Sequence, residues 1–236
     1  MIARCPPASV RRVAQLPRTM PLLELPRGTI LYRVHDLDAA CDAFIASDSD
    51  PGSPRRGGRF DPLPQHAPVP VLYAASRPEA ALAEVLVHID ARGVLHPDGT
   101  AELPCRALSR LRVARTLRVV AFCGLDLHRF PVRHAQLAEC GKSDYPRTRG
   151  WALAIRRRAR RAQGMAWVSR QDNTALSFVF WHDRMEPGDL EPQGRPVPLA
   201  GRRGAAMVRD VLGRIGMAPL PSRAVRASPR PRGRRS

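Results

Sequence analysis

The sequence predicts one compact α+β domain with flexible ends in a chain of 236 residues. Segments of strand length and segments of helical period both occur, but they do not alternate regularly as a doubly wound parallel sheet requires. No glycine-rich dinucleotide fingerprint follows a predicted strand. Scattered proline and arginine dominate residues 1–24 and 219–236. We therefore assign the domain to residues 25–218.

The first predicted strand covers residues 28–34, a short segment rich in β-branched and aromatic residues. Side chains alternate between the two faces of a strand, so Arg33 shares a face with Leu31 while Tyr32 lies on the other. A lone guanidinium in an apolar strand has two readings. It binds an anionic ligand, or it lies in solvent at a sheet edge. A helix is expected next, over residues 38–46.

A second strand is predicted at residues 69–75, a continuous apolar run typical of a buried strand. The segment 76–79, Ser-Arg-Pro-Glu, fits a capping box with proline in the first helical turn. The helix that begins there is expected to run to Ile89. Its core stripe consists of Leu82, Val85, Leu86 and Ile89.

The second half of the chain is predicted to contain three more strands and two more helices. The apolar runs 117–122, 165–169 and 176–181 are bounded by polar residues and have strand length. Helices are expected at 147–163 and at 205–215, where apolar residues recur at helical spacing.

The net charge of +18 invites a nucleic-acid-binding interpretation. Nearly every cation is arginine, with Lys142 the only lysine, and the charge is concentrated in residues 147–161 and 223–235. Aromatic residues make up 5% and are not interleaved with basic residues, which argues against a stacking surface for single strands. Contact with nucleic acid is therefore expected only through the basic tail or through a partner protein.

The five cysteines are odd in number and lack a Cys-x-x-Cys pair, so reduced thiols are expected. The seven histidines show no metal-ligand spacing, and no metal site is predicted. No apolar run approaches the roughly 20 residues of a membrane span, and the N-terminus lacks the apolar segment of a secretory signal. The expected location is cytoplasmic.

Two polar side chains lie where a ligand can approach. Arg59 follows Gly57 and Gly58, and glycines let the backbone come close to a ligand. The alternative is a tight surface turn. Glu84 lies on the predicted helix beside small alanines and away from the core stripe, which leaves room for a ligand. The alternative is an ordinary solvent-exposed glutamate.

Two further side chains have ordinary structural readings. Tyr73 lies inside an apolar strand, as a core tyrosine with a hydrogen-bonded hydroxyl does. Ser169 ends a strand before a polar turn, which it can cap. No Gly-x-Ser-x-Gly elbow surrounds Ser169, so a hydrolase nucleophile is not predicted.

Together these segments resemble the RES-domain toxins, NAD+-degrading bacterial toxins whose fold is similar to that of ADP-ribosyltransferases. The resemblance spans residues 28–181, and its matching pieces are 31–34, 57–60, 72–75, 81–86 and 164–170. The chain departs from the family at Phe60 and Asp61, where Trp and Asn are more usual. A carboxylate beside a diphosphate is unfavourable unless Arg59 or another neighbour pairs with it.

The resemblance implies an enzyme that cleaves the nicotinamide–ribose bond of NAD+, with phosphate or water taking the C1 position. Its implied catalytic residues are Glu84, Arg33, Tyr73 and Ser169, and its implied substrate-binding residues are Arg59, Gly58 and Tyr32. Glu84 would stabilise the positive charge that develops on the ribose. The arginines would bind diphosphate or phosphate, Tyr73 would shape the nicotinamide side, and Ser169 would orient ribose or phosphate.

NAD+ is then a substrate and inorganic phosphate a co-substrate, so no resident cofactor is expected. Family members pair with an Xre-type helix-turn-helix antitoxin that blocks the active site, which implies an inhibitory protein partner. Two alternatives stand beside this reading. One is a protein ADP-ribosyltransferase on the same fold, and the other is a basic nucleic-acid-binding module without enzyme activity.

Overall fold

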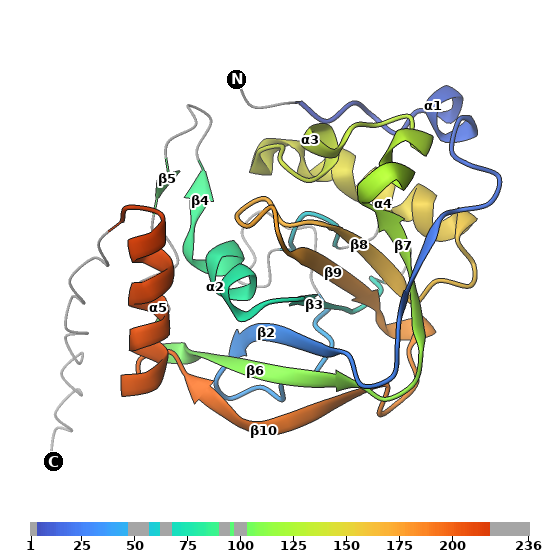
Figure 1. Ribbon diagram of the computed structural model, residues 1–236. Coiled ribbons are helices and arrows are strands. Elements are labelled where there is room, and N and C mark those ends of the chain that lie inside the picture. The colour runs from blue at the N-terminus through green and yellow to red at the C-terminus, as the bar shows by residue number, and fades with distance from the viewer. Residues whose placement is uncertain (1–3, 47–56, 62–67, 90–94, 97–102, 218–236) are drawn as a thin grey trace, which may run out of the picture.

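The computed structural model describes residues 4–46, 57–61, 68–89, 95–96 and 103–217 (Figure 1). A curved eight-stranded sheet lies at its centre, in the order β1-β7-β8-β9-β3-β2-β6-β10. These strands are β1 (Leu22–Leu25), β2 (Ile30–Asp36), β3 (Val71–Ala75), β6 (Arg106–Val113), β7 (Leu117–Phe122), β8 (Gly164–Val168), β9 (Leu176–Trp181) and β10 (Leu190–Pro198). A small separate sheet pairs β4 (His88–Ile89) with β5 (Leu95–His96).

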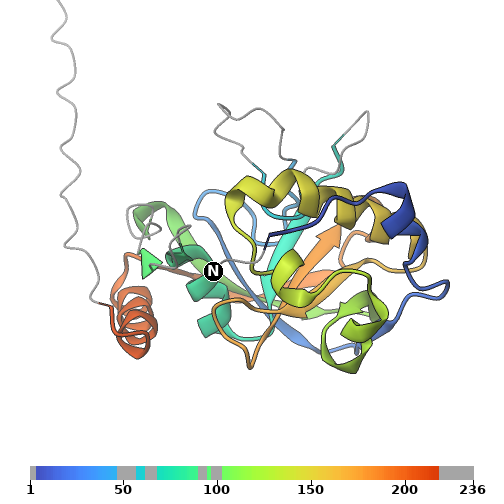
Figure 2. The same cartoon turned by 90° about the horizontal axis from the view of Figure 1, so that it is seen from above.

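Helices cover the outer faces of this sheet. They are α1 (Val10–Ala14), α2 (Pro78–Leu86), α3 (His134–Leu137), α4 (Tyr145–Arg158) and α5 (Arg202–Arg214), with short 3-10 helices η2 (Gly124–Arg129), η3 (Lys142–Asp144) and η4 (His182–Arg184). Figure 2 shows α2 and α5 side by side at one end of the molecule, while α3 and α4 lie over the sheet at the other. The α+β prediction is confirmed.

The curvature of the sheet creates three apolar cores. One lies inside the curve and joins Leu31 and Leu111 to Phe178 and Phe180 on the opposite half. A second lies between α4 and strands β7, β8 and β9, and the third packs α2 and α5 against the outer side of the β2–β6 half. Both faces of β8 and β9 are therefore buried, which explains why their sequences read as continuous apolar runs.

The sheet opens between β2 and β3. β2 pairs with β6 along its whole length, and β3 pairs with β9 along all five of its residues. The pairing of β2 with β3 consists of Tyr32 opposite Ala75. Beyond that pair the two strands diverge, and Ile45 pairs with Val71 at the far end of β3 instead. This divergence makes room for a cleft inside an otherwise continuous sheet.

The predicted helix at 38–46 is wrong. That segment consists of turns, and its main-chain groups bond to other elements rather than to each other at helical spacing. Arg33 donates hydrogen bonds to the carbonyls of Cys41 and Ala43, while Ile45 exchanges two main-chain hydrogen bonds with Val71. Tertiary partners thus override the local preference for a helix.

The predicted capping box at residues 76–79 is also wrong. The N-cap residue of α2 is Arg77, which forms no side-chain cap, and the Ser76 hydroxyl accepts a hydrogen bond from Leu176 N at 2.9 Å instead. Pro78 is in the first helical turn, as expected. The hydroxyl thereby links the start of α2 to the start of β9.

The N-terminal segment differs from the flexible extension expected for residues 1–24. From residue 4 onward it packs on the domain, with Cys5, Leu16 and Met20 buried in the core beneath α4. Trp151 Nε1 donates a hydrogen bond to Pro6 O at 2.8 Å. β1 then pairs antiparallel with β7 at the edge of the sheet. The predicted basic tail, 219–236, lies outside the described residues.

None of the helices in the described part of the chain combines the length and the apolar composition needed to cross a membrane.

Gly164 begins β8 where β8 and β9 approach closely. A Cβ atom there would lie 2.1 Å from Val179 O and 3.1 Å from Phe180 Cα, so main-chain atoms would have to move. We predict that Gly164→Ala lowers the free energy of unfolding by about 1–3 kcal/mol, measured by urea denaturation. Gly150→Ala in α4 is the control, because its Cβ would meet only Ala8 Cβ at 3.5 Å. Equal stability of the two variants would contradict this packing argument.

His35 gives the fold a dependence on pH. Its ring is buried on β2 and hydrogen-bonds Ser109 Oγ through Nε2 at 2.8 Å. Burial lowers the pKa of His35 below its ordinary value. His35 therefore binds a proton more readily in the unfolded chain than in the folded one. Its contribution to the free energy of unfolding is fully present above about pH 6.5 and is lost as the pH falls below that value. Urea denaturation between pH 8 and pH 5 should show this loss, and His35→Gln should reduce it; an unchanged slope in the variant would assign the loss to other groups.

Candidate functional site

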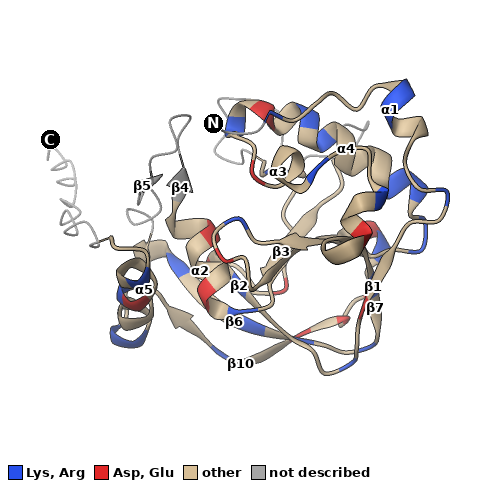
Figure 3. Ribbon diagram, turned by 45° about the horizontal axis from the view of Figure 1, so that its top comes forward, with Lys and Arg blue, Asp and Glu red and all other residues tan. Residues whose placement is uncertain are grey.

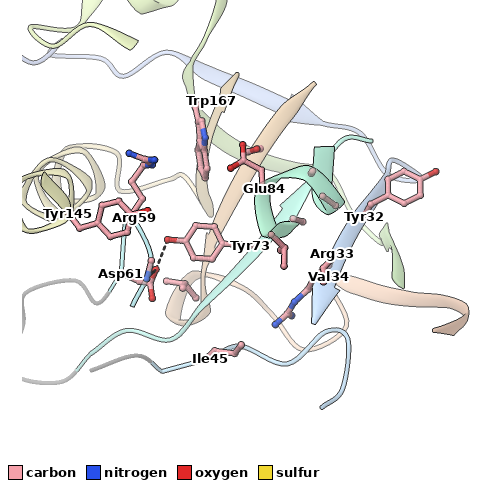
Figure 4. Close-up of a pocket in the computed structure, with 17 residues that line it drawn as sticks. Tyr32, Arg33, Val34, Ile45, Arg59, Asp61, Tyr73, Glu84, Tyr145 and Trp167 are labelled. Atoms are coloured by element: carbon pink, nitrogen blue, oxygen red, sulfur yellow. Dashed lines mark hydrogen bonds between the residues drawn. The ribbon is translucent and has the colours of Figure 1, made fainter. Parts of the chain in front are cut away.

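A cleft of about 380 Å³ opens where β2 and β3 diverge (Figure 4). Its walls come from these two strands, from the turn at 57–61, from α2 and from the first residue of α4. Six of the seven predicted site residues line it, namely Arg33, Tyr73, Glu84, Arg59, Gly58 and Tyr32. The seventh, Ser169, contacts Glu84 from behind. The structure thus brings the whole predicted set together.

Glu84 is held in one orientation at the wall of the cleft. It lies half-buried on α2, where its neighbour Ala81 also lines the cleft. Its Oε1 accepts hydrogen bonds from Ser169 Oγ at 2.6 Å and from Arg170 N at 3.1 Å. No other hydrogen bond to Glu84 comes from the described residues, so Oε2 is left for a ligand. The reading of an ordinary solvent-exposed glutamate does not fit these contacts.

Ser169 combines the turn-capping reading with a contact to the site. Its side chain is buried directly after β8, and its Oγ accepts weaker hydrogen bonds from Gln171 N at 3.2 Å and Asp172 N at 3.3 Å. The hydroxyl proton goes to Glu84. Ser169 is not among the residues that line the cleft, so its geometry is that of a positioning residue for Glu84 rather than of a ligand contact.

Arg33 lines the cleft. It does not lie at a sheet edge, because β2 lies between β3 and β6. Its side chain is only 4% exposed, and Nη1 donates to Cys41 O at 2.9 Å and to Ala43 O at 2.6 Å. Burial lowers the pKa of Arg33 to about 10, so the guanidinium is still charged at neutral pH. The remaining N–H groups of the guanidinium can bind an anion.

Arg59 extends from the glycine turn toward α4. Its Nη1 donates to Cys140 O at 2.8 Å and to Cys140 Sγ at 3.1 Å, and its guanidinium lies 5.1 Å from the centre of the Tyr145 ring. The turn itself is bound to α4, because Arg149 donates to the carbonyls of Gly57 and Gly58. It is therefore an ordered wall of the cleft rather than a free surface turn.

Asp61 accepts a hydrogen bond from a hydroxyl, and Arg59 does not pair with it. Tyr73 Oη donates to Asp61 Oδ1 at 2.5 Å, and Gly58 N donates to the same oxygen at 2.9 Å. Phe60 N in turn donates to Tyr73 Oη at 3.1 Å. Burial, with a further contribution from Asp61, raises the pKa of Tyr73 well above its ordinary value, so the phenol keeps its proton. Figure 4 shows this pair between Arg33 on one side and Arg59 with Tyr145 on the other.

Trp167, Tyr145 and Ser177 are among the cleft residues that the sequence analysis did not assign to the site. Trp167 meets Phe60 and Tyr73 edge to face, with ring centres 4.8 and 6.4 Å apart. Tyr145 lines the cleft beside Arg59, and Ser177 lines it from β9. Strand alternation could have indicated Trp167, because it lies two residues before Ser169 and so on the same face of the strand. This face packs against the core shared with α4. The other two carry no sequence signal, because only the tertiary fold brings them to the cleft.

The cleft therefore combines two guanidinium groups, the carboxylates of Glu84 and Asp61, and aromatic side chains. Such a set suits a ligand with phosphate groups, sugar hydroxyls and a planar ring. Within the described ranges, no group of three or more His, Cys, Asp or Glu side chains could hold a metal ion.

Comparisons with known proteins concern the family and the fold. The family model described as the RES domain matches residues 30–200. The fold is similar to a chain in the crystal structure of the M. tuberculosis MbcT–MbcA toxin–antitoxin complex, with a TM-score of 0.56 and 17% identity over 86% of this chain and 96% of that chain. This likeness fits an ADP-ribosyltransferase-like fold. The comparison with curated protein sequences gave no match.

Gly58 is the glycine on which the Asp61–Tyr73 pair depends. A Cβ atom there would lie 2.8 Å from Asp61 Oδ1 and 3.1 Å from Tyr73 Oη. We predict that Gly58→Ala separates this pair and lowers the free energy of unfolding by about 1–3 kcal/mol, measured by urea denaturation. Gly213→Ala in α5 is the control, because no atom lies within 4 Å of its added Cβ. A Gly58→Ala structure that keeps the Asp61–Tyr73 hydrogen bond would contradict the prediction.

Proposed function

The chain belongs to the RES-domain family, and from this membership we propose that it is the toxin of a toxin–antitoxin pair that cleaves NAD+. The fold shared with a chain of a toxin–antitoxin complex supports the toxin role. One observation carries the chemical part of the proposal. It is the Glu84 carboxylate, held by Ser169 and Arg170 at the wall of a cleft that also contains two arginines.

In the proposed reaction the bond between the ribose C1 and the nicotinamide nitrogen breaks. The bonding electrons go to the nitrogen, so the ring leaves as neutral nicotinamide and positive charge develops on the ribose. Glu84 Oε2 accepts hydrogen bonds from the ribose hydroxyls and stabilises that charge more strongly than it stabilises the ground state. Because Ser169 and Arg170 already fix Oε1, the carboxylate needs little reorganisation during the reaction.

The two arginines bind phosphate groups in this proposal. Arg33 and Arg59 each use Nη1 for a main-chain carbonyl, which fixes the guanidinium and leaves other N–H donors for the ligand. One anion is the diphosphate of NAD+, and the other is inorganic phosphate. An oxygen of inorganic phosphate forms the new bond to C1, which gives ADP-ribose 1-phosphate. Water in the same position gives ADP-ribose and a proton.

The proposed partner is an Xre-type helix-turn-helix antitoxin. Figure 3 shows basic residues on α1 and α4, the helices of one outer face. Arg157 and Arg158 at the end of α4 are exposed. This charge favours a partner with an acidic surface. Because NAD+ and such a partner are intracellular, the proposal includes a cytoplasmic location.

The test of this function is the incubation of purified protein with NAD+, with and without phosphate, followed by identification of the products. We predict that Glu84→Gln lowers kcat by roughly 10²–10³-fold, as removal of one charge-stabilising group does in other enzymes. Ser169→Ala should lower kcat less, because Arg170 N still holds the carboxylate.

Glu79→Gln is the matched control. Glu79 lies on the same helix but outside this cleft, and its Oε2 lies 3.6 Å from Arg77 Nε. The Glu79→Gln variant should therefore keep wild-type turnover. Near-wild-type turnover by a folded Glu84→Gln protein would refute the role of Glu84. Modification of an added protein, without free ADP-ribose or its phosphate, would favour a protein ADP-ribosyltransferase instead.

A further inference from the structure

Asp61 is a buried carboxylate that faces the cleft without a cationic partner among the described residues. Its side chain is 3% exposed and lines the cleft. Oδ1 accepts both of its hydrogen bonds, from Tyr73 Oη and Gly58 N, and none from the described residues reaches Oδ2. The family resemblance leads one to expect asparagine here. This chain therefore has a negative charge where a neutral amide would satisfy the same hydrogen bonds.

The surrounding cations do not neutralise this charge. Arg59 is directed to Cys140 and the Tyr145 ring, and Arg33 to the carbonyls of Cys41 and Ala43. A buried carboxylate is costly unless it is both hydrogen-bonded and paired with a positive charge. Asp61 meets the first condition within the described residues, and a ligand can meet the second.

The neighbouring side chains define the shape of that ligand. The Asp61–Tyr73 pair lies against Trp167, whose ring meets Tyr73 and Phe60 edge to face. Aromatic side chains attract a cation to their faces and pack well against a flat ring. A carboxylate beside aromatic rings therefore suits a planar cation rather than a sugar or a phosphate.

We propose that Asp61 is a specificity-determining residue that selects a ligand with a positively charged planar ring. The inference rests on the proposed function and deepens it. Of the two forms of the dinucleotide, the oxidised one carries a cationic pyridine ring and the reduced one a neutral ring. Asp61 makes the cleft bind the oxidised form in preference to the reduced form.

This role differs from that of Glu84. When the ring leaves as neutral nicotinamide, its positive charge is lost, so a carboxylate beside the ring stabilises the bound substrate more than the transition state. Asp61→Asn is therefore expected to raise KM while kcat stays the same or increases. Glu84→Gln acts on kcat.

The direct experiment measures equilibrium binding by calorimetry in a Glu84→Gln background, which slows turnover. The Glu84→Gln protein should bind NAD+ about tenfold or more tightly than NADH, and Asp61→Asn added to it should remove this preference. Tyr73→Phe separates the charge of Asp61 from its hydrogen bond, because it removes the hydrogen bond but keeps the carboxylate, so the comparison is of the NAD+ to NADH affinity ratio and not of the affinities themselves. It should retain the preference for NAD+. Circular dichroism shows whether each variant is folded.

Two results would overturn the inference. If Asp61→Asn weakens NAD+ and NADH binding equally, the charge of Asp61 does not distinguish the two rings. If Asp61→Asn changes neither the NAD+ affinity nor the NADH affinity, the charge of Asp61 has no part in recognition.

A second pair of probes separates this inference from the proposed function. The cation 1-methylnicotinamide should bind the wild-type protein more tightly than neutral nicotinamide, and Asp61→Asn should equalise the two. A protein that shows this difference but does not consume NAD+ would contradict the proposed function and keep the inference. A protein that consumes NAD+ and binds both probes equally would support the proposed function and contradict the inference about Asp61.

Discussion

The separation of β2 from β3 is the constraint on which the site depends. The two strands share the pair Tyr32–Ala75, and each is bound along its other edge to a long neighbour, β6 or β9. The apolar core inside the curved sheet packs against both halves of the sheet. It thereby fixes the position of each half while β2 and β3 diverge. Main-chain groups released there bond elsewhere, as those of Val71 do with Ile45. A cleft inside a sheet can therefore exist without loss of the hydrogen bonds that hold the sheet together.

Each charged side chain in the cleft is positioned by a neutral group. Ser169 and a main-chain amide hold Glu84, two carbonyls hold Arg33, and a carbonyl and a thiol hold Arg59. None of these three side chains forms an ion pair with another residue in the described part of the chain. Their charges are therefore directed at a ligand rather than neutralised within the protein. Such an arrangement is typical of sites that bind or stabilise charge in a substrate.

Much of the fold could be predicted from local patterns. The apolar runs at 117–122 and 176–181 match β7 and β9, because both faces of these strands are buried. β6 and β10 were missed. β6 carries exposed or half-buried arginines between its buried residues, and β10 is an edge strand that contains prolines and a glycine, so neither reads as apolar. The segment 38–46 was predicted incorrectly because the side chain of Arg33 on β2 and the main chain of Val71 on β3 hydrogen-bond its main-chain groups.

The structure places six of the seven predicted residues at one cleft, but their contacts could not be predicted. Glu84 and Arg59 were indicated by small neighbours, and the cleft contains both. The sequence carries no signal that Ser169 bonds Glu84 or that Tyr73 bonds Asp61, since 85 and 12 residues separate the partners. Tyr145 reaches the cleft only because α4 packs across the sheet. Hydrogen bonds between distant segments are therefore the part that required the structure.

In the proposed function, this cleft breaks the bond between nicotinamide and ribose and transfers the ADP-ribosyl group to phosphate. The most direct measurement incubates the purified protein with NAD+ and ¹⁸O-labelled inorganic phosphate and follows the products by mass spectrometry. We predict free nicotinamide together with ADP-ribose that carries a labelled phosphate at C1. Intact NAD+ after incubation with folded protein would contradict it, and unlabelled ADP-ribose as the sole product would show that water, not phosphate, is the acceptor.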